Sequence, residues 1–251
     1  MQKLNIFSYL CTMKSTDLII ERINKIGEGK IFTYKDLMLP LAMQSAAAMS
    51  LSRMVAENKL KKAGKGKFYK PLYSRLGEMS PALEELTKDL LNKDGRTIGY
   101  ITGVPAFAQL GLTTQISSQI KIGSKTYRRP LERGGYEISY IKQENEINNN
   151  SIPLLRYLDA LRFIKKIPAC TIDEAIKILL QKLLSFTEQE IKNLLDYSKN
   201  YPSSTRALLG AILELSGFSD NSLKATLNPL TTYKLGVSTN VLPNKSNWNI
   251  L

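Results

Sequence analysis

The chain has 251 residues, enough for two or three small domains, and its 43% hydrophobic and 23% charged residues are an ordinary globular composition. Thirty-five lysines and arginines against 22 acids give a net charge of +13, which favours an anionic partner such as nucleic acid. The absence of histidine excludes a Ser-His-Asp triad and histidine metal ligands, and two cysteines cannot form a Cys₄ zinc site.

No run of about 18 apolar residues is present, so the sequence predicts no membrane span. The apolar stretch 4–13 lacks a small-residue cleavage site, and we interpret it as a leader or packing arm rather than a signal peptide. Cys11 and Cys170 are expected to be reduced core residues. These features predict a cytoplasmic protein without a membrane partner, cofactor or metal.

The positive charge is concentrated near the N-terminus. Residues 1–71 carry a net charge of +8, against +1 for residues 72–150 and +4 for residues 151–251. Within residues 59–70, six of twelve positions are lysine and none is acidic. A lysine run is often only a solvated surface, so its meaning depends on the elements around it.

The first 71 residues predict three helices and a hairpin. The spacing of Leu18, Ile19 and Ile23 indicates a helix that begins near Ser15 and ends at Gly27. A short strand at 31–32 follows, then a second helix capped by Thr33 and limited by a proline, and a third helix over 45–57. Residues 60–71 predict two strands around a Gly-Lys-Gly turn.

This order is typical of a winged helix-turn-helix, in which the third helix enters the DNA major groove and the hairpin meets phosphates. On that helix Ala47, Leu51, Met54 and Val55 form the expected core stripe, opposite Ala46, Met49, Ser50 and Arg53. The candidate DNA-binding residues are polar or basic: Gln44, Ser45, Ser50, Ser52, Arg53, Lys61, Lys62, Lys65 and Lys67. The alternative is a small helical domain whose lysines serve solubility.

Residues 73–150 predict a small α+β region. Its expected elements are a helix from Ser80-Pro81 to about Asn92 and strands at 97–101, 119–123 and 136–142. The basic cluster of Lys125, Arg128, Arg129 and Arg133 extends the basic surface or, the interpretation we favour, keeps a loop soluble. The polar, Asn-rich residues 143–151 are interpreted as a linker.

From residue 152 the chain predicts helices only, followed by an extended tail that packs back on the body. Thr171 with Glu174 and Thr187 with Glu190 match the capping box, and the last helix covers about 203–215. The expected fold is therefore α+β and mainly helical. Its predicted domains are 1–72 (winged helix-turn-helix), 73–150 (α+β middle domain) and 151–251 (helical region with tail), with 73–251 as one domain in the alternative.

Several segments resemble the AbiEi-type antitoxins. Residues 27–32 leading to 36–37, with 51–54 and 66–71, resemble the N-terminal winged helix of that family, and residues 102–115 and 201–211 resemble a subgroup of it. The resemblance implies an antitoxin of a type IV toxin–antitoxin, or abortive-infection, module that represses its own operon at inverted repeats in double-stranded DNA. It further implies that the C-terminal region counters a nucleotidyltransferase-like toxin, with or without direct contact.

Two other function classes remain open. A metal-dependent nuclease would need clustered carboxylates, for which Glu84, Glu85, Asp89 and Asp94 are the candidates. A pure protein-interaction module would leave the lysines without a role. We favour the antitoxin and autorepressor, without catalytic residues.

Overall fold

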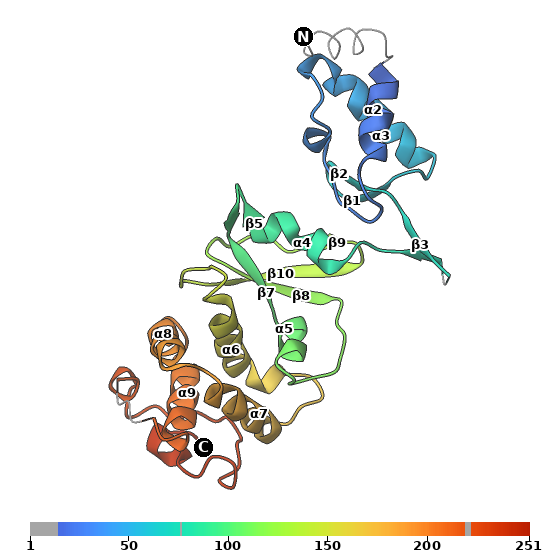
Figure 1. The fold of residues 1–251 in the computed structure, drawn as a ribbon. Coiled ribbons are helices and arrows are strands. Elements are labelled where there is room, and N and C mark those ends of the chain that lie inside the picture. Colours follow the sequence, from blue (N-terminus) through green and yellow to red (C-terminus); the bar gives the residue numbers. More distant parts are fainter. Residues whose placement is uncertain (1–14, 76, 219–221) are drawn as a thin grey trace. The chain divides into compact units, whose positions relative to one another are not determined.

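A computed structural model describes residues 15–75, 77–218 and 222–251; the predicted arm at 4–13 and Cys11 lie outside this range. The chain folds into two compact units, residues 1–89 and 90–251, and each is treated by itself below (Figure 1). The fold is α+β and mainly helical, as the sequence predicts. None of the helices in the described ranges combines the length and the apolar character that a membrane crossing requires.

The described part of the first unit contains helices, short 3₁₀ turns and two hairpins. Its elements are α2 (Ser15–Asn24), η1 (Tyr34–Leu37), η2 (Leu41–Met43), α3 (Gln44–Ala56), β1 (Lys61–Gly64), β2 (Lys67–Tyr69), β3 (Leu72–Ser74), β4 (Gly77–Met79) and the start of α4 (Leu83–Leu91). Ile19 and Ile23 of α2 pack with Ala47 and Leu51 of α3 in one buried core. The predicted strand at 31–32 is reduced to an antiparallel bridge between Phe32 and Phe68 of β2.

Three details of this unit differ from the prediction. The second helix is a single 3₁₀ turn, which the Asp36 carboxylate stabilises by accepting from the Thr33 amide (2.7 Å) and hydroxyl (2.8 Å). The α4 helix begins at Leu83, two residues after the Ser80-Pro81 start expected from the sequence. The β3–β4 hairpin was not expected, because its short strands alternate too few residues to give a pattern.

The second unit opens with a two-stranded hairpin, which is followed by a four-stranded sheet. The elements before the helical part are β5 (Asn92–Lys93), β6 (Arg96–Thr97), β7 (Gly99–Thr102), α5 (Val104–Gln109), β8 (Gln119–Ser124), β9 (Leu131–Arg133) and β10 (Tyr136–Lys142). The strand order is β7-β8-β10-β9; β8 and β10 are parallel, and the other neighbours are antiparallel. Ile120, Ile122 and Ile138 are fully or almost fully buried, so their face of the sheet is covered.

Residues 143–151 are not a linker, contrary to the prediction. Gln143, Asn145 and Ser151 are buried, and their side chains bond to backbone groups of the segment or of a neighbouring helix. The Asn145 side chain donates to the carbonyl of Tyr197 (3.0 Å), and the Ser151 hydroxyl donates to the carbonyl of Glu146 (2.8 Å). The polar side chains of this segment therefore form hydrogen bonds with buried backbone groups rather than with solvent.

The remaining elements are helical and pack into one core with the sheet. They are α6 (Ile152–Arg162), η3 (Ile164–Lys166), α7 (Ile172–Leu184), α8 (Glu188–Ser198), α9 (Ser203–Leu215), η4 (Lys224–Thr226) and η5 (Lys245–Trp248). Both predicted capping boxes are present at the starts of α7 and α8. The tail packs back on α9, as expected, and the Trp248 indole donates to Glu214 at 2.5 Å.

A buried polar network joins the sheet to these helices. The Asp159 carboxylate on α6 accepts from the hydroxyls of Tyr100 on β7 (2.7 Å) and Tyr201 (3.0 Å). The Gln143 amide donates to both of these hydroxyls, at 3.0 and 2.8 Å. Burial raises the pKa of Asp159 to about 6, although the two tyrosine hydrogen bonds act in the opposite direction.

The division of the chain differs from the predicted domains. The boundary lies at 89/90 within α4 rather than at 72/73, and no boundary separates 150 from 151. Residues after 72 also form ion pairs with the first unit: Glu78 pairs with Lys61, and Asp89 pairs with Lys67. Residues 90–251 form one unit, close to the alternative in which the middle and C-terminal regions are a single domain.

Candidate nucleic-acid interface

The α3 helix is held by its apolar stripe and presents the other side to solvent. Ala47 and Leu51 are buried in the core of the first unit. The solvent-facing positions are Gln44, Ser45, Ala48, Met49, Ser52, Arg53 and Ala56. Apart from Gln44, Met49 and Arg53 these side chains are short, so another surface can approach the helix closely.

One predicted site residue is misplaced. Ser50 is only 9% exposed, because it lies three positions after Ala47 and falls at the edge of the core stripe. Ser50 therefore offers little surface to DNA, unlike the other predicted residues of this helix. Gln44, Ser45, Ser52 and Arg53 remain together on the solvent side of the helix.

Arg53 is the single cation on this helix. Its side chain is 62% exposed, and its Nε lies 3.9 Å from the Glu57 carboxylate, one turn further along. Lys59 makes the closer contact with Glu57 (2.8 Å), and this hydrogen bond lowers the pKa of the Glu57 carboxyl. The Arg53 guanidinium is thus only loosely held and can turn toward a ligand.

A hollow lies beside the first turn of α3. It has a volume of about 230 Å³ and is lined by Tyr34, Lys35, Leu39, Gln44 and Ala47. Tyr34 and Lys35 are not among the predicted site residues. The sequence signal that could have indicated them is their position directly after Thr33, the predicted cap of the second helix.

The β1–β2 hairpin carries the lysine run, but its lysines are not equivalent. Lys61 pairs with Glu78 (3.4 Å) and Lys67 pairs with Asp89, so both tie the hairpin to later residues. Lys62 and Lys65 are exposed, and neither forms an ion pair within the described ranges. These two of the four predicted hairpin lysines are therefore the ones that no described carboxylate pairs with.

The turn of the hairpin explains why Lys65 projects freely. Gly66 has φ of +67°, a left-handed conformation that glycine adopts without strain, and no atom lies within 4 Å of a Cβ placed there. The register shifts between Lys62 and Gly64, which bends the strand locally. The turn is therefore open to solvent on its outer side.

The carboxylates considered for a nuclease do not converge. Glu85 accepts from the Lys30 ammonium (2.6 Å), and Asp89 binds Lys67. In the part of the chain that the structure describes, no three potential metal-ligating side chains of Asp, Glu or Cys lie together. Glu85 and Asp89 thus serve as ion-pair partners for lysines of the first unit.

The fold and this surface define an α+β protein whose first unit exposes a small-residue helix face and a basic hairpin turn. The chain belongs to DUF6088, a family of unknown function, whose model matches residues 18–195. A solved structure, the RV2827C protein from Mycobacterium tuberculosis, is similar, with a TM-score of 0.46 and 14% identity over 86% of this chain and 82% of that chain. A comparison with curated proteins found no match.

Proposed function

We propose that the first unit binds double-stranded DNA as a winged helix-turn-helix, with α3 in the major groove and the β1–β2 turn on the phosphate backbone. The observation that carries the proposal is the pairing of an exposed α3 face, containing Gln44, Ser45, Ser52 and Arg53, with the unpaired lysines Lys62 and Lys65 of the next element. The order α2, Phe32 bridge, η1, α3, β1, β2 follows that of the motif.

The chemistry of the α3 face suits DNA. Amide, hydroxyl and guanidinium groups hydrogen-bond base edges, and an exposed methionine suits the thymine methyl group. Met49 is 70% exposed in the middle of this face. Lysines bind phosphates as point charges without reading sequence, which fits the hairpin turn.

On the resemblance to AbiEi-type antitoxins, we further propose that the chain represses its own operon and counters a nucleotidyltransferase-like toxin. Binding at inverted repeats would require two first units on one operator, one for each half-site. The second unit, with its separate core, is the candidate region for the action against the toxin.

A salt titration tests the DNA-binding part of the proposal. Binding of the full chain to random duplex DNA should weaken steeply with salt, and Lys62→Ala with Lys65→Ala should lower the slope of log K against log salt by about 2, roughly 0.9 for each phosphate contact. Affinity for the operator and for random DNA should fall by similar factors.

The matched control is Lys61→Ala with Lys67→Ala, which removes two lysines of the same hairpin that are already ion-paired. This variant should keep the salt slope of the wild type while its thermal midpoint falls. Two results would contradict the proposed interface. One is a salt slope of log K that falls as far in the control as in the Lys62→Ala and Lys65→Ala chain, and the other is wild-type binding that does not depend on salt.

A further inference from the structure

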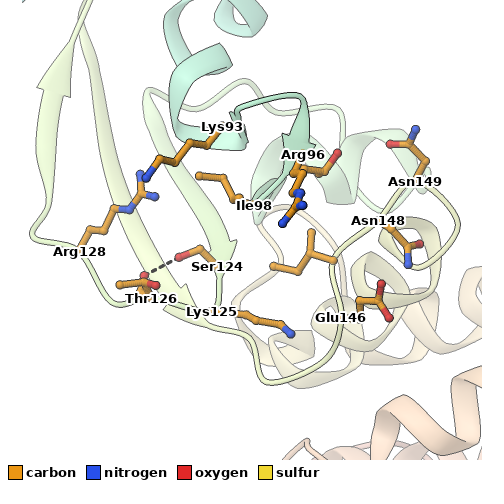
Figure 2. Close-up of a pocket in the computed structure, with 12 residues that line it drawn as sticks. Lys93, Arg96, Ile98, Ser124, Lys125, Thr126, Arg128, Glu146, Asn148 and Asn149 are labelled. Atoms are coloured by element: carbon orange, nitrogen blue, oxygen red, sulfur yellow. Dashed lines mark hydrogen bonds between the residues drawn. The ribbon is translucent and has the colours of Figure 1, made fainter.

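We propose that the second unit contains a binding site for a nucleoside polyphosphate, separate from the DNA interface. The site is a cavity of about 740 Å³, within the size range of small-molecule pockets. Three segments line it: the β5–β6 hairpin, the end of β8 with the loop that follows, and the loop before α6 (Figure 2).

The cavity is strongly cationic. Lys93, Arg96, Lys125 and Arg128 line it, and Glu146 is its single carboxylate. None of the four cations forms an ion pair with the residues that the structure describes. Four cations converging on one concave surface repel each other unless an anion lies between them.

The β5–β6 hairpin places two of these cations side by side. Lys93 and Arg96 are cross-strand partners, joined by the tight turn Asp94-Gly95, in which both residues have positive φ. Directly opposed side chains lie on the same face of a hairpin, where like charges are destabilising. Both cations therefore stand at the rim of the cavity, where they can contact a bound phosphate.

The opposite wall is held in place by local contacts. The Arg128 guanidinium lies 5.9 Å from the centre of the Tyr140 ring, and Figure 2 shows this side chain and Lys93 pointing toward each other. The buried Ser124 hydroxyl donates to the carbonyl of Thr126 (2.5 Å), which fixes the turn that carries Lys125. Lys125 and Arg128 thus lie in the loop after β8, where these two contacts restrain the turn and the Arg128 guanidinium.

An apolar patch in the same cavity favours a nucleotide over a bare phosphate. Ile147 is buried, Ile98 is half-buried, and both line the cavity with the cations. A flat base can pack on such a patch while the guanidinium and ammonium groups take the phosphates. The cluster that sequence analysis assigned to loop solubility contributes only Lys125 and Arg128, and its partners Lys93 and Arg96 come from a distant hairpin.

The test is calorimetric titration of the full chain with ATP, GTP and inorganic tripolyphosphate, each against equal ionic strength of sulfate. At least one nucleotide should bind and raise the thermal midpoint of the chain. Lys93→Ala with Arg128→Ala should weaken that binding at least tenfold, and Lys125→Ala alone should weaken it less. The matched control, Arg129→Ala with Lys192→Ala, removes two exposed cations that do not line the cavity and should bind as the wild type does.

Three results would overturn the proposal. The first is binding no tighter than that of sulfate for every nucleotide. The second is equal affinity for tripolyphosphate and nucleotides, which would leave the isoleucines without a base to bind. The third concerns the chain with Lys62→Ala and Lys65→Ala. If that chain still binds duplex DNA and the DNA displaces the nucleotide, the cavity is part of a nucleic-acid surface. If that variant loses DNA binding but keeps nucleotide binding, the nucleotide site is independent of the DNA interface.

Discussion

Arg53 is the residue at which contact between α3 and DNA can be tested most directly. Its guanidinium is exposed and weakly paired, so Arg53→Ala should cost about 1–3 kcal/mol of binding free energy if it reads a base. That loss would be confined to one base-pair position in operator variants. If Arg53 clamps a phosphate instead, the loss would be uniform across sequences and the salt slope would fall by about 1.

The control on the same helix is Ser50→Ala, because Ser50 is buried and cannot reach a ligand. Footprinting and affinity should match the wild type in that variant. A wild-type footprint for Arg53→Ala as well would mean that this face of α3 does not meet DNA.

Asp159 predicts a pH dependence of stability that is opposite to that of most carboxylates. Its folded-state pKa of about 6 lies above its ordinary value of 3.8, so the folded protein holds this proton more tightly than the unfolded chain. The contribution is full below about pH 4 and is lost as the pH rises through 6, a change on the order of 3 kcal/mol.

Denaturant unfolding of the wild type and of Asp159→Asn between pH 4 and 7 measures this effect. The stability of the wild type relative to the variant should fall across that range as Asp159 ionises. Carboxylates with a lowered pKa, such as Glu174 and Glu190, contribute equally to both chains and cancel in the comparison. Parallel stability curves would show that Asp159 does not titrate as a buried acid.

At the scale of elements, the close packing of the tail on α9 depends on one glycine, Gly210, against which the Trp248 ring lies. A Cβ on Gly210 would lie 2.1 Å from the Trp248 ring, so Gly210→Ala should destabilise the second unit by about 1–3 kcal/mol through overpacking, despite alanine's better helix propensity. The thermal midpoint measures the change. Trp248→Leu in the same background should recover part of the loss, and an unchanged midpoint for Gly210→Ala alone would contradict this packing.

Elements whose signals are local could be predicted from the sequence. The capping boxes at Thr171 and Thr187 depend on residues three positions apart, and the structure has both. The order of helices and the β1–β2 hairpin likewise follow from short-range periodicity and turn residues. The 143–151 segment was misjudged because its bonds reach Tyr197, more than 50 residues away.

The candidate site shows the same limit. The lysine run was visible in the sequence, but which lysines are free was not, because Glu78 and Asp89 lie beyond the hairpin. Ser50 was misplaced because a position at the edge of a helical stripe is assigned by packing rather than by spacing. The cavity of the second unit depends on three segments that no sequence window contains.

At the scale of the whole molecule, repression and antitoxin action should separate by point substitution. A full chain with Arg53→Ala, Lys62→Ala and Lys65→Ala should no longer repress a reporter under its own promoter. On the proposed antitoxin function, the same chain should still protect cells that express a cognate nucleotidyltransferase-like toxin, since the second unit is unchanged.

Substitution is preferable to truncation near residue 71, which would remove the partners of Lys61 and Lys67. The control is the chain with Lys61→Ala and Lys67→Ala, which should repress and protect. Loss of protection together with repression in the triple variant would mean that the antitoxin effect acts through DNA.

Trp248 is the chain's single tryptophan, and it is buried against α9 in the second unit. Its intrinsic fluorescence therefore reports on that unit alone, while circular dichroism at 222 nm records helices of both units. Coincident denaturation curves from the two signals would mean that the units unfold as one cooperative system. Curves that differ would resolve the stability of each unit within the intact chain, without labels or fragments.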